Sequence, residues 1–557
     1  MPDVNDQLAK AVALHRDGRL DEAAALYRAI LDGAPGQADA RHLLGLIRHQ
    51  QGDHAGALAD IDTAIALVSD VAMYHANRSR VLTALDRHPD ALAAAERAVA
   101  FEPDNAETLS DLAGVLLRLD RAPEALTAAE RAVSLAPGLD AARRNLALAR
   151  FEVGFLAQEA GDLDAAEALY RGALELDPER IEALVNLGNV FRLRYRVADA
   201  ALCYEAALAK GCVLPEVFGN LGVIRQEMGD TAAAIKCYDR ALAAEPDNPE
   251  IRRNRAQALL KQGRFEEGWR EFEWRWLTAH FNHFRRDWVK PRWTGQPLLG
   301  ETVLIHAEQG YGDSLQFARY LPMVAERGAK VIVECPRPLM SLLATVAGVV
   351  EVFEYGTDAP NHDYQIPMMS LPGAFATGAA SIPADVPYLV PADAARAKWR
   401  ERIGTGDGRR IGLVWKGSAN HQRNDWRSPG LAAFLPLMEL EGTTWFSLQK
   451  DDEAADLDGM GLTDRITALG DGFVDFSDTA AAIECLDLVI SPDTAVAHLA
   501  GALARPVWLV LPFASEWRWL EHRSDSPWYP TMRLFRQAAY GDWASAVRAM
   551  AMVLKGA

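Results

Sequence analysis

The stretch CLDLVISPDTAVAHLAGALARPVWLVLP, Cys485–Pro512, has the pattern of a strand, a turn, a helix and a second strand. Short apolar runs on either side of a helical segment are typical of parallel β–α units. A helix that begins directly after a strand points its free N–H groups and its positive dipole end away from the sheet. The stretch therefore predicts an anion site, suited to a nucleotide phosphate, at the start of this helix.

Polar side chains gather at that predicted helix start. Thr494 and His498 are four residues apart, so they share one face of the helix, and the Thr494 hydroxyl adds a donor. Asp493 stands at the mouth, where it can cap the helix or accept from sugar hydroxyls. An alternative stays open, in which Ser491 and Asp493 are ordinary N-caps and His498 is a core residue. The predicted donor-binding residues of this segment are Asp493, Thr494, Ala495, Val496 and His498.

The same alternation of strands and helices extends over the second half of the chain. A first set of β-branched runs is TVLIHA (302–307), KVIVEC (330–335), VVEVF (349–353) and DYQIPM (363–368), and a second set is IGLVWKG (411–417), TWFSLQ (444–449), LDLVIS (486–491) and VWLVLP (507–512). Two consecutive sets of β–α units predict two parallel sheets with helices on both faces. Ligands bind at the carboxyl ends of such strands, so the predicted site lies between the two sheets.

Two further loops follow predicted strands. In HAEQGYGDSLQFARY (306–320), Gly310 and Gly312 free the backbone and Asp313 directly precedes a helix. A carboxylate there can take a proton from an attacking hydroxyl, and the alternative is that Asp313 is only an N-cap.

The second loop, VWKGSANHQRNDWRS (414–428), can hold a phosphate leaving group, because arginine pairs with phosphate oxygens and lysine adds charge. Its candidate residues are Lys416, Ser418, Asn420, His421, Arg423 and Arg427.

The first half of the chain is periodic. Small residues recur every 34 residues at Ala23, Ala57, Ala91 and Ala125, and again at Ala166, Ala200, Ala234 and Gly268, with seven extra residues between the two series. The pattern resembles the tetratricopeptide repeat in eight units over about 275 residues. Each unit is expected to be two antiparallel helices, and stacked units form a superhelix with a concave groove.

One polar position recurs in these units. It is occupied by Asn77, Asp111, Asn186, Asn220 and Asn254. An amide carries donors and an acceptor, so a ladder of asparagines can pair with a peptide backbone of any sequence. The repeat-fused O-GlcNAc transferases, which the array resembles, use such a ladder. The alternative is that asparagine serves local packing. The predicted acceptor-peptide residues are Asn77, Asn186, Asn220 and Asn254.

The bulk composition excludes some classes of partner. The formal net charge is −19, which makes a nucleic-acid backbone an unsuitable main partner. The sequence shows neither a cationic leader nor an apolar run of about 18 residues. It therefore predicts a protein that is cytoplasmic and not inserted in a membrane. The Asp-Leu-Asp segment at Asp456–Asp458 resembles a metal-binding D-x-D, but it lies in a polar stretch and is interpreted as a solvated loop. The aromatic segment Gly263–Trp276 is expected to cap the last repeat against the next domain, with cation–π stacking as the alternative.

The three loops together resemble a known enzyme family. Gly312-Asp313 and Asp493-Thr494-x-x-x-His498 are similar to motifs of the heptosyltransferase-like glycosyltransferases of the GT-B fold. The repeat array and the segment EWRWLEHRSDSPWYPTMRLFRQ (516–537) resemble more closely the bacterial repeat-fused flagellin glycosyltransferases of the FlmG type. The resemblance implies an α-solenoid followed by an α/β GT-B domain of two Rossmann-like lobes. The expected domains are a repeat superhelix at 1–280, an amino-terminal lobe at 281–395 and a nucleotide-sugar lobe at 396–557.

The resemblance implies an inverting, metal-independent transfer of a sugar from a nucleotide sugar to Ser or Thr of a protein, with flagellin as the suggested acceptor. Asp313 is the expected catalytic base, and Lys416 stands where the family resemblance implies a small residue. The co-substrate implied is a CMP-activated nonulosonic acid such as pseudaminic acid, with no resident cofactor and no metal. The expected donor-binding residues are Gly312, Lys416, Ser418, Asn420, Arg427, Asp493, Thr494, Ala495, Val496 and His498.

Two other functions fit the same sequence. A non-catalytic scaffold would combine a repeat adaptor with a degenerate nucleotide-binding domain. A glycosyltransferase acting on lipopolysaccharide or another glycan would keep the catalytic domain, although the long peptide-style groove argues against it.

Overall fold

The computed structural model describes residues 4–282, 284–286, 289–405, 408–417, 424–450 and 453–556. The chain divides into two compact units, Met1–Val213 and Leu214–Ala557. The predicted boundary near residue 280 marks the change from helices to strands, whereas the boundary between compact units comes earlier. The last two helical pairs therefore belong to the same unit as the α/β region, and residue 395 lies within helix α21 (Asp393–Ile403).

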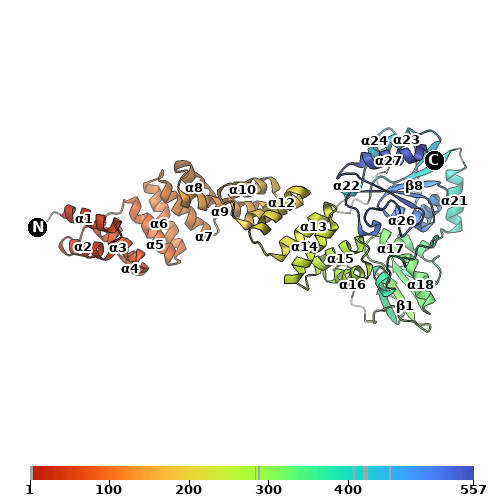
Figure 1. Ribbon diagram of the computed structural model, residues 1–557, viewed down its shortest axis with the longest axis horizontal. Coiled ribbons are helices and arrows are strands. Elements are labelled where there is room, and N and C mark those ends of the chain that lie inside the picture. Colours follow the sequence, from red (N-terminus) through yellow and green to blue (C-terminus); the bar gives the residue numbers. More distant parts are fainter. Residues whose placement is uncertain are drawn as a thin grey trace. The chain divides into compact units, whose positions relative to one another are not determined.

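Sixteen helices occupy the described part of the chain up to Phe272, so the prediction of about eight helical pairs is confirmed. In most pairs the first helix has 13 residues and the second has 14. The helices, which Figure 1 labels along the chain, are α1 (Val4–Arg16), α2 (Leu20–Gly33), α3 (Ala38–Gln50), α4 (His54–Leu67), α5 (Ala72–Ala84), α6 (His88–Phe101), α7 (Ala106–Arg118), α8 (Ala122–Leu135), α9 (Asp140–Glu159), α10 (Leu163–Leu176), α11 (Ile181–Leu193), α12 (Val197–Ala209), α13 (Pro215–Glu227), α14 (Thr231–Ala244), α15 (Pro249–Lys261) and α16 (Phe265–Phe272).

Small residues on the first helix of a pair meet tyrosines on the second. A Cβ atom at Gly188 would lie 2.7 Å from Cε1 of Tyr204, sixteen residues later. At Gly222 the corresponding distance to Cε1 of Tyr238 is 2.5 Å. Because these rings are fully buried, a larger residue at the glycine would push the two helices apart.

The turn inside each pair requires a left-handed backbone. Positive φ angles occur at residues 18, 52, 86 and 120, and after the seven-residue insertion at 161, 195, 229 and 263. Glycine fills five of these positions, since it adopts this conformation at little steric cost. Asp86 and Asp120 (φ 56° at both) are tolerated because a short polar side chain can bond locally, while Tyr195 (φ 56°) is an uncommon choice.

The seven-residue insertion lies within helix α9, which has 20 residues. Seven residues are close to two turns of 3.6 residues, so the insertion lengthens the helix without rotating its faces out of register. The first part of α9 continues the spacing of the preceding units, and Gly154 in its second part packs against the ring of Tyr170 as the later glycines do.

The α/β region contains two sheets in which every strand pairing is parallel, as the sequence predicts. The four-stranded sheet has the order β3-β2-β1-β4 and consists of β1 (Thr302–His306), β2 (Lys330–Cys335), β3 (Val349–Glu354) and β4 (Tyr364–Pro367). The six-stranded sheet has the order β10-β9-β8-β5-β6-β7 and consists of β5 (Arg409–Leu413), β6 (Thr443–Ser447), β7 (Ile466–Ala468), β8 (Leu488–Pro492), β9 (Val507–Leu511) and β10 (Met532–Arg536).

Strands β7 and β10 were not predicted. They are the two edges of the six-stranded sheet, where a strand is paired on one side only and needs no long apolar run. The remaining helices are α17 (Tyr311–Phe317), α18 (Leu321–Glu326), α19 (Met340–Leu343), α20 (Leu371–Ala374), α21, α22 (Asn424–Arg427), α23 (Leu435–Met438), α24 (Glu453–Gly459), α25 (Phe476–Glu484), α26 (Ala495–Ala502) and α27 (Trp543–Lys555).

The order of the six-stranded sheet fixes where its loops meet. Numbered within the sheet, the strands follow 3-2-1-4-5-6, which is the order of a doubly wound α/β sheet. Both faces are covered, because Leu488 and Ile490 pack in one core with Met550 of α27 and Val489 packs in another with Leu499 of α26. The order reverses between β5 and β8, so the loops after these two strands leave the sheet side by side in opposite directions.

The last repeat helix packs directly on the α/β region. Trp269 of α16 lies edge-on to Trp517 with ring centroids 5.3 Å apart, and its indole N–H donates to the carbonyl of Thr377 at 2.9 Å. The prediction that Gly263–Trp276 caps the last repeat against the next domain is confirmed within unit 214–557. The cation–π alternative also holds, since the Arg275 guanidinium stacks on Trp276 at 4.7 Å from the ring centroid.

Candidate functional site

The loop after β1 places Asp313 in the first turn of α17. Gly310 is the N-cap residue, and its N–H donates to Oδ2 of Asp313 at 2.9 Å, which is the capping role that the sequence left open. Oδ1 of Asp313 is ion-paired with Arg518. Both carboxylate oxygens therefore have partners inside the protein, and the side chain is 16% exposed.

Gly312 brings α17 onto the beginning of α26 (Figure 1). A Cβ atom at this position would lie 3.0 Å from Cδ2 of His498 and 3.6 Å from the Cα of Ala495. Any side chain would crowd the imidazole, so the Gly-Asp pair combines a close approach of two helices with a carboxylate at their junction. This packing joins the loop after β1 of one sheet to the loop after β8 of the other.

Thr494 is the N-cap of α26, but its side chain makes no cap hydrogen bond. Its hydroxyl lies 2.8 Å from Oγ of Ser491 instead. The backbone N–H groups of Ala495 and Val496 thus stand in a first turn whose positive dipole end is not covered by a capping side chain. This is the geometry that the sequence predicted for an anion site, formed at the carboxyl end of a central strand.

Asp493 and His498 form a buried polar pair beside this helix start. Oδ2 of Asp493 accepts from the indole N–H of Trp519 at 2.8 Å, and Oδ1 lies 3.6 Å from Nε2 of His498. Nδ1 of His498 lies 2.9 Å from the hydroxyl of Tyr529, and the imidazole stacks on Trp519. Burial alone would raise the pKa of Asp493, but the interaction with His498, the hydrogen bond from Trp519 and the charge of Arg518 outweigh it and lower this pKa. Asp493 is therefore an ionised carboxylate that orients two rings.

Arg427 of α22 reaches the same place from the loop after β5. Its Nη1 donates to the backbone carbonyl of Asp493 at 3.3 Å, and its buried Nε has no hydrogen-bond partner among the described residues. Lys416 does not join the cluster, because its Nζ is ion-paired with Asp456 at 2.6 Å. Asp456 also accepts from the indole of Trp415 at 2.7 Å and lies in α24, so the interpretation of Asp456–Asp458 as a solvated loop is wrong for this residue. Ser418, Asn420, His421 and Arg423 lie outside the described residues.

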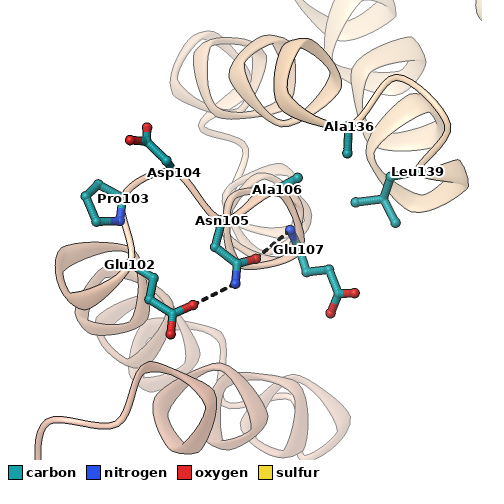
Figure 2. Close-up of a pocket in the computed structure, with 8 residues that line it drawn as sticks. All are labelled: Glu102, Pro103, Asp104, Asn105, Ala106, Glu107, Ala136 and Leu139. Atoms are coloured by element: carbon teal, nitrogen blue, oxygen red, sulfur yellow. Dashed lines mark hydrogen bonds between the residues drawn. The ribbon is translucent and has the colours of Figure 1, made fainter.

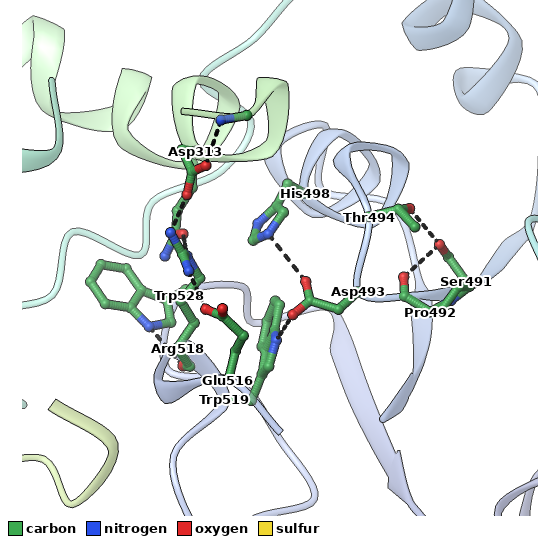
Figure 3. Close-up of polar contacts among 12 residues, drawn as sticks. Asp313, Ser491, Pro492, Asp493, Thr494, His498, Glu516, Arg518, Trp519 and Trp528 are labelled. Carbon is green, nitrogen blue, oxygen red and sulfur yellow. Dashed lines mark hydrogen bonds and ion pairs between the residues drawn. The ribbon is translucent and has the colours of Figure 1, made fainter. Parts of the chain in front are cut away.

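Arg518 and Glu516 complete the cluster, and neither residue was predicted to have a role. Arg518 donates from Nη1 to Glu516 at 2.5 Å and from Nε to Gln316 at 2.7 Å, in addition to its pairing with Asp313. Figure 3 shows Glu516 and Arg518 on one side of the site and Asp493 with His498 on the other. We call Asp313, Asp493, Glu516, Arg518 and Arg427 the carboxylate–arginine cluster.

A duplicated tetrapeptide is the sequence signal that could have found Arg518. Glu-Trp-Arg-Trp occurs at 273–276 and again at 516–519. Arg275 of the first copy is fully buried and binds both carboxylate oxygens of Glu308, at 2.8 and 3.1 Å. Glu308 and Asp313 belong to the same segment after β1, so the two copies hold that segment at two points.

The predicted peptide-binding asparagines have internal contacts. Nδ2 of Asn77 lies 2.9 Å from Nε2 of buried His42, and its Oδ1 accepts from Arg80 at 3.2 Å. Asn186, Asn220 and Asn254 are partly exposed at the same position of their helices. Asn145, which was not predicted although it follows Asp111 by the regular 34 residues, occupies this position too and donates to the carbonyl of Ser110 at 2.8 Å. The amides at Asn77 and Asn145 thus link the first helices of neighbouring repeats. At these two positions the structure agrees with the alternative that asparagine serves local packing.

A hollow of about 770 Å³ lies on the repeat array, between the loop preceding α7 and the start of α9 (Figure 2). Asn105 caps α7 from its rim, accepting from the N–H of Glu107 at 2.9 Å and donating to Glu102 at 2.7 Å. The lining contains no residue of the predicted site. It consists of Glu102, Pro103, Asp104, Asn105, Ala106, Glu107, Ala136 and Leu139.

Comparisons with known proteins agree with the repeat array. Residues 8–72, 77–140, 156–211 and 220–273 match the family model of the tetratricopeptide repeat. The chain is 27% identical over 439 residues to Protein FlbA of Caulobacter vibrioides, which covers 68% of this chain and 73% of that protein. It is 44% identical over 84 residues to the TPR repeat-containing thioredoxin TTL4 of Arabidopsis thaliana, covering 15% of this chain and 12% of the relative.

Among solved structures, YrrB, a TPR protein with an unusual peptide-binding site, aligns over 33% of this chain and 92% of its own, with 21% identity and a TM-score of 0.29. No helix in the described ranges has the length and apolar character that crossing a bilayer requires. The match to the family model and the two sheets together show that the chain carries tetratricopeptide repeats followed by an α/β region with two parallel sheets.

Proposed function

We propose that this tetratricopeptide-repeat protein is an inverting glycosyltransferase that moves a sugar from a nucleotide sugar to Ser or Thr of a protein acceptor. In this proposal the two parallel sheets are the two lobes of a GT-B domain. The repeats hold the acceptor, and the carboxylate–arginine cluster holds the donor and the reacting groups.

The observation that carries the proposal is the meeting of three loops from two sheets. Asp313 follows β1, Arg427 follows β5 and Asp493 follows β8. These residues are joined through Arg518 and the contact of Gly312 with His498. Strands β5 and β8 flank the point where the order of the six-stranded sheet reverses, which is where doubly wound sheets bind their ligands.

The groups present suit transfer from a phosphate leaving group. As the anomeric carbon–oxygen bond breaks, negative charge grows on the phosphate, and Arg427 and the N–H groups at the start of α26 can stabilise it. A carboxylate of the cluster, Asp313 in the sequence prediction, takes the proton of the acceptor hydroxyl. Attack from the face opposite the leaving group inverts the anomeric carbon.

The resemblance to flagellin-modifying enzymes supports the finer assignment. It suggests flagellin as the acceptor, bound along the repeats with Asn186, Asn220 and Asn254 as its backbone partners. It also suggests a CMP-activated nonulosonic acid such as pseudaminic acid as the donor.

Calorimetry with the full chain tests the donor site. CMP, UDP, GDP and ADP and their sugar conjugates are titrated into the wild-type protein and into Arg427→Ala. We expect one nucleotide to bind, and R427A to weaken its binding at least tenfold, because a charge-assisted contact to phosphate is worth about 1.5–3 kcal/mol. Arg465→Ala, which removes a surface arginine paired with Glu439, is the matched control and should bind as the wild type does.

A non-catalytic scaffold is the second candidate, and one observation favours it. Both oxygens of Asp313 and the ammonium of Lys416 already have partners within the protein. No nucleotide binding by the wild-type protein would support the scaffold and contradict the enzyme. Transfer of sugar to purified flagellin, read as an increase in intact mass, would contradict the scaffold.

A further inference from the structure

The two Glu-Trp-Arg-Trp copies give one tetrapeptide two different surroundings. In each copy the arginine bonds the glutamate two residues before it and a carboxylate of the segment after β1. Each copy also forms a short 3₁₀ turn, over Glu273–Leu277 and Trp517–Trp519. The two copies therefore act as an internal comparison of what the same residues do in two places.

The first copy is closed around its arginine, although its glutamate, Glu273, is 31% exposed. Arg275 has no exposed side-chain surface, and its partner Glu308 is 1% exposed. Glu273 is held from two sides, by Arg275 at 3.0 Å and by Arg292 at 2.6 Å. All carboxylates of this copy are thus tied to arginines, which is the arrangement of a structural ion-pair network.

The second copy is open at its glutamate. The Glu516 side chain is 50% exposed, and its only hydrogen bond among the described residues runs from Arg518 to Oε2. Asp313, the other partner of Arg518, has both oxygens engaged and is 16% exposed. Figure 3 shows the Glu516 carboxylate directed into the space between Arg518 and Asp493. Glu516 is therefore the carboxylate of the cluster with an oxygen left for an incoming hydroxyl.

The charges around the two glutamates shift their pKa values in opposite directions. For Glu516, desolvation by the surrounding protein raises the pKa, Arg518 opposes the rise, and Asp493 and Asp313 add to it. Arg427 and Lys261 are the other charged groups that act on Glu516. For Glu273, burial is outweighed by Arg275 and Arg292, and the pKa is lowered.

We infer that Glu516 is the proton acceptor of the proposed transfer and that Asp313 is a positioning residue, which fixes Arg518 and through it Glu516. The inference rests on the proposed function. In the step, the acceptor oxygen bonds the anomeric carbon, the carbon–phosphate oxygen bond breaks, and the nucleotide leaves with the electron pair. The hydroxyl proton passes to the Glu516 carboxylate.

The test is the pH profile of kcat/KM for the full chain, with flagellin as acceptor and the nucleotide sugar found by calorimetry as donor. The variants are Glu516→Gln, Asp313→Asn and Glu273→Gln. E516Q should lose at least 100-fold in rate, the usual contribution of a general base, and should lose the acid limb of the profile. D313N should be slower than the wild type but keep the acid limb of the pH profile. E273Q is the matched change in the first copy and should keep both the wild-type rate and the acid limb.

Nucleotide affinity and thermal unfolding, measured on the same proteins, separate the outcomes. E516Q should fold and bind the donor as the wild type does. A folded E516Q that retains its acid limb and at least a tenth of the rate would overturn the inference, as would loss of the limb in D313N alone. Wild-type protein that neither binds nor consumes any nucleotide sugar would overturn the proposed function itself, and the inference with it.

Discussion

The repeat array at 4–213 and the α/β region at 289–556 are stabilised by contacts of different range. In the repeats the same contact recurs at a fixed spacing, as between Gly188 and Tyr204 or Gly154 and Tyr170. In the α/β region the contacts that build the cluster join distant segments, such as Asp313 with Arg518 and His498 with Tyr529. A change in the repeats should therefore act locally, whereas a change in the cluster should affect several loops together.

A spectroscopic feature allows the two units to be measured separately. All 14 tryptophans lie in residues 269–543, within unit 214–557. Tryptophan fluorescence therefore follows the unfolding of that unit alone, while far-ultraviolet circular dichroism follows the helices of both units.

The largest effect is expected from Arg275→Ala. It leaves Glu308 buried without a counter-charge, and breaking a buried ion pair costs about 3–5 kcal/mol. Urea unfolding followed by tryptophan fluorescence should show this loss, while the part of the circular dichroism transition that fluorescence does not follow should stay unchanged. Arg275→Met with Glu308→Leu is the control and should recover much of the loss, because two apolar residues replace both charges. Equal destabilisation of both units would contradict the division between them.

A pH effect of roughly 3 kcal/mol is expected within the repeats. Burial lowers the pKa of His42 from 6.5 to about 4, with Asp39 opposing. The unfolded chain takes up this proton more readily, so the free energy of unfolding falls as pH drops from 6.5 towards 4, by roughly 3 kcal/mol at 1.36 kcal/mol per pKa unit. The glutamine of His42→Gln can still accept from Asn77. The free energy of unfolding of this variant, measured by circular dichroism at a series of pH values, should lack the decrease that protonation of His42 causes. An identical slope in both proteins would place the imidazole in solvent.

The smallest effect is expected from Gly188→Ala. The added methyl would lie 2.7 Å from the buried Tyr204 ring, and overpacking of this kind costs about 1–3 kcal/mol. Gly33→Ala, in a helix with nothing within 4 Å of the added methyl, should instead stabilise by about 0.5–1 kcal/mol. Both changes should shift the circular dichroism transition and leave the fluorescence transition unaltered. A G188A variant that is more stable than the wild type would show that the Tyr204 ring does not set the distance between the two helices.

Much of the candidate site was predictable because single loops carried it. Gly312, Asp313, Asp493 and His498 follow apolar strands, and the start of a helix limits what such residues can do. The role of Lys416 as a phosphate ligand was not predictable in the same way, because it depends on Asp456, which lies on another element. Asn145 follows Asp111 by the regular 34 residues, so the period of the chain could have identified it as well.

The sequence by itself determined the repeat array and the alternation of strands and helices. The array repeats every 34 residues, and its contacts lie within or between neighbouring units, so a period in the chain is also a period in space. Only the tertiary structure decided which glutamate of two identical tetrapeptides pairs with two arginines and which pairs with one and is half exposed. Glu273 is held between Arg275 and Arg292, whereas Glu516 shares Arg518 with Asp313, which lies 205 positions before that arginine. The exposure and the pKa of a side chain depend on the residues that the fold places next to it. Two identical tetrapeptide sequences cannot predict these different neighbours.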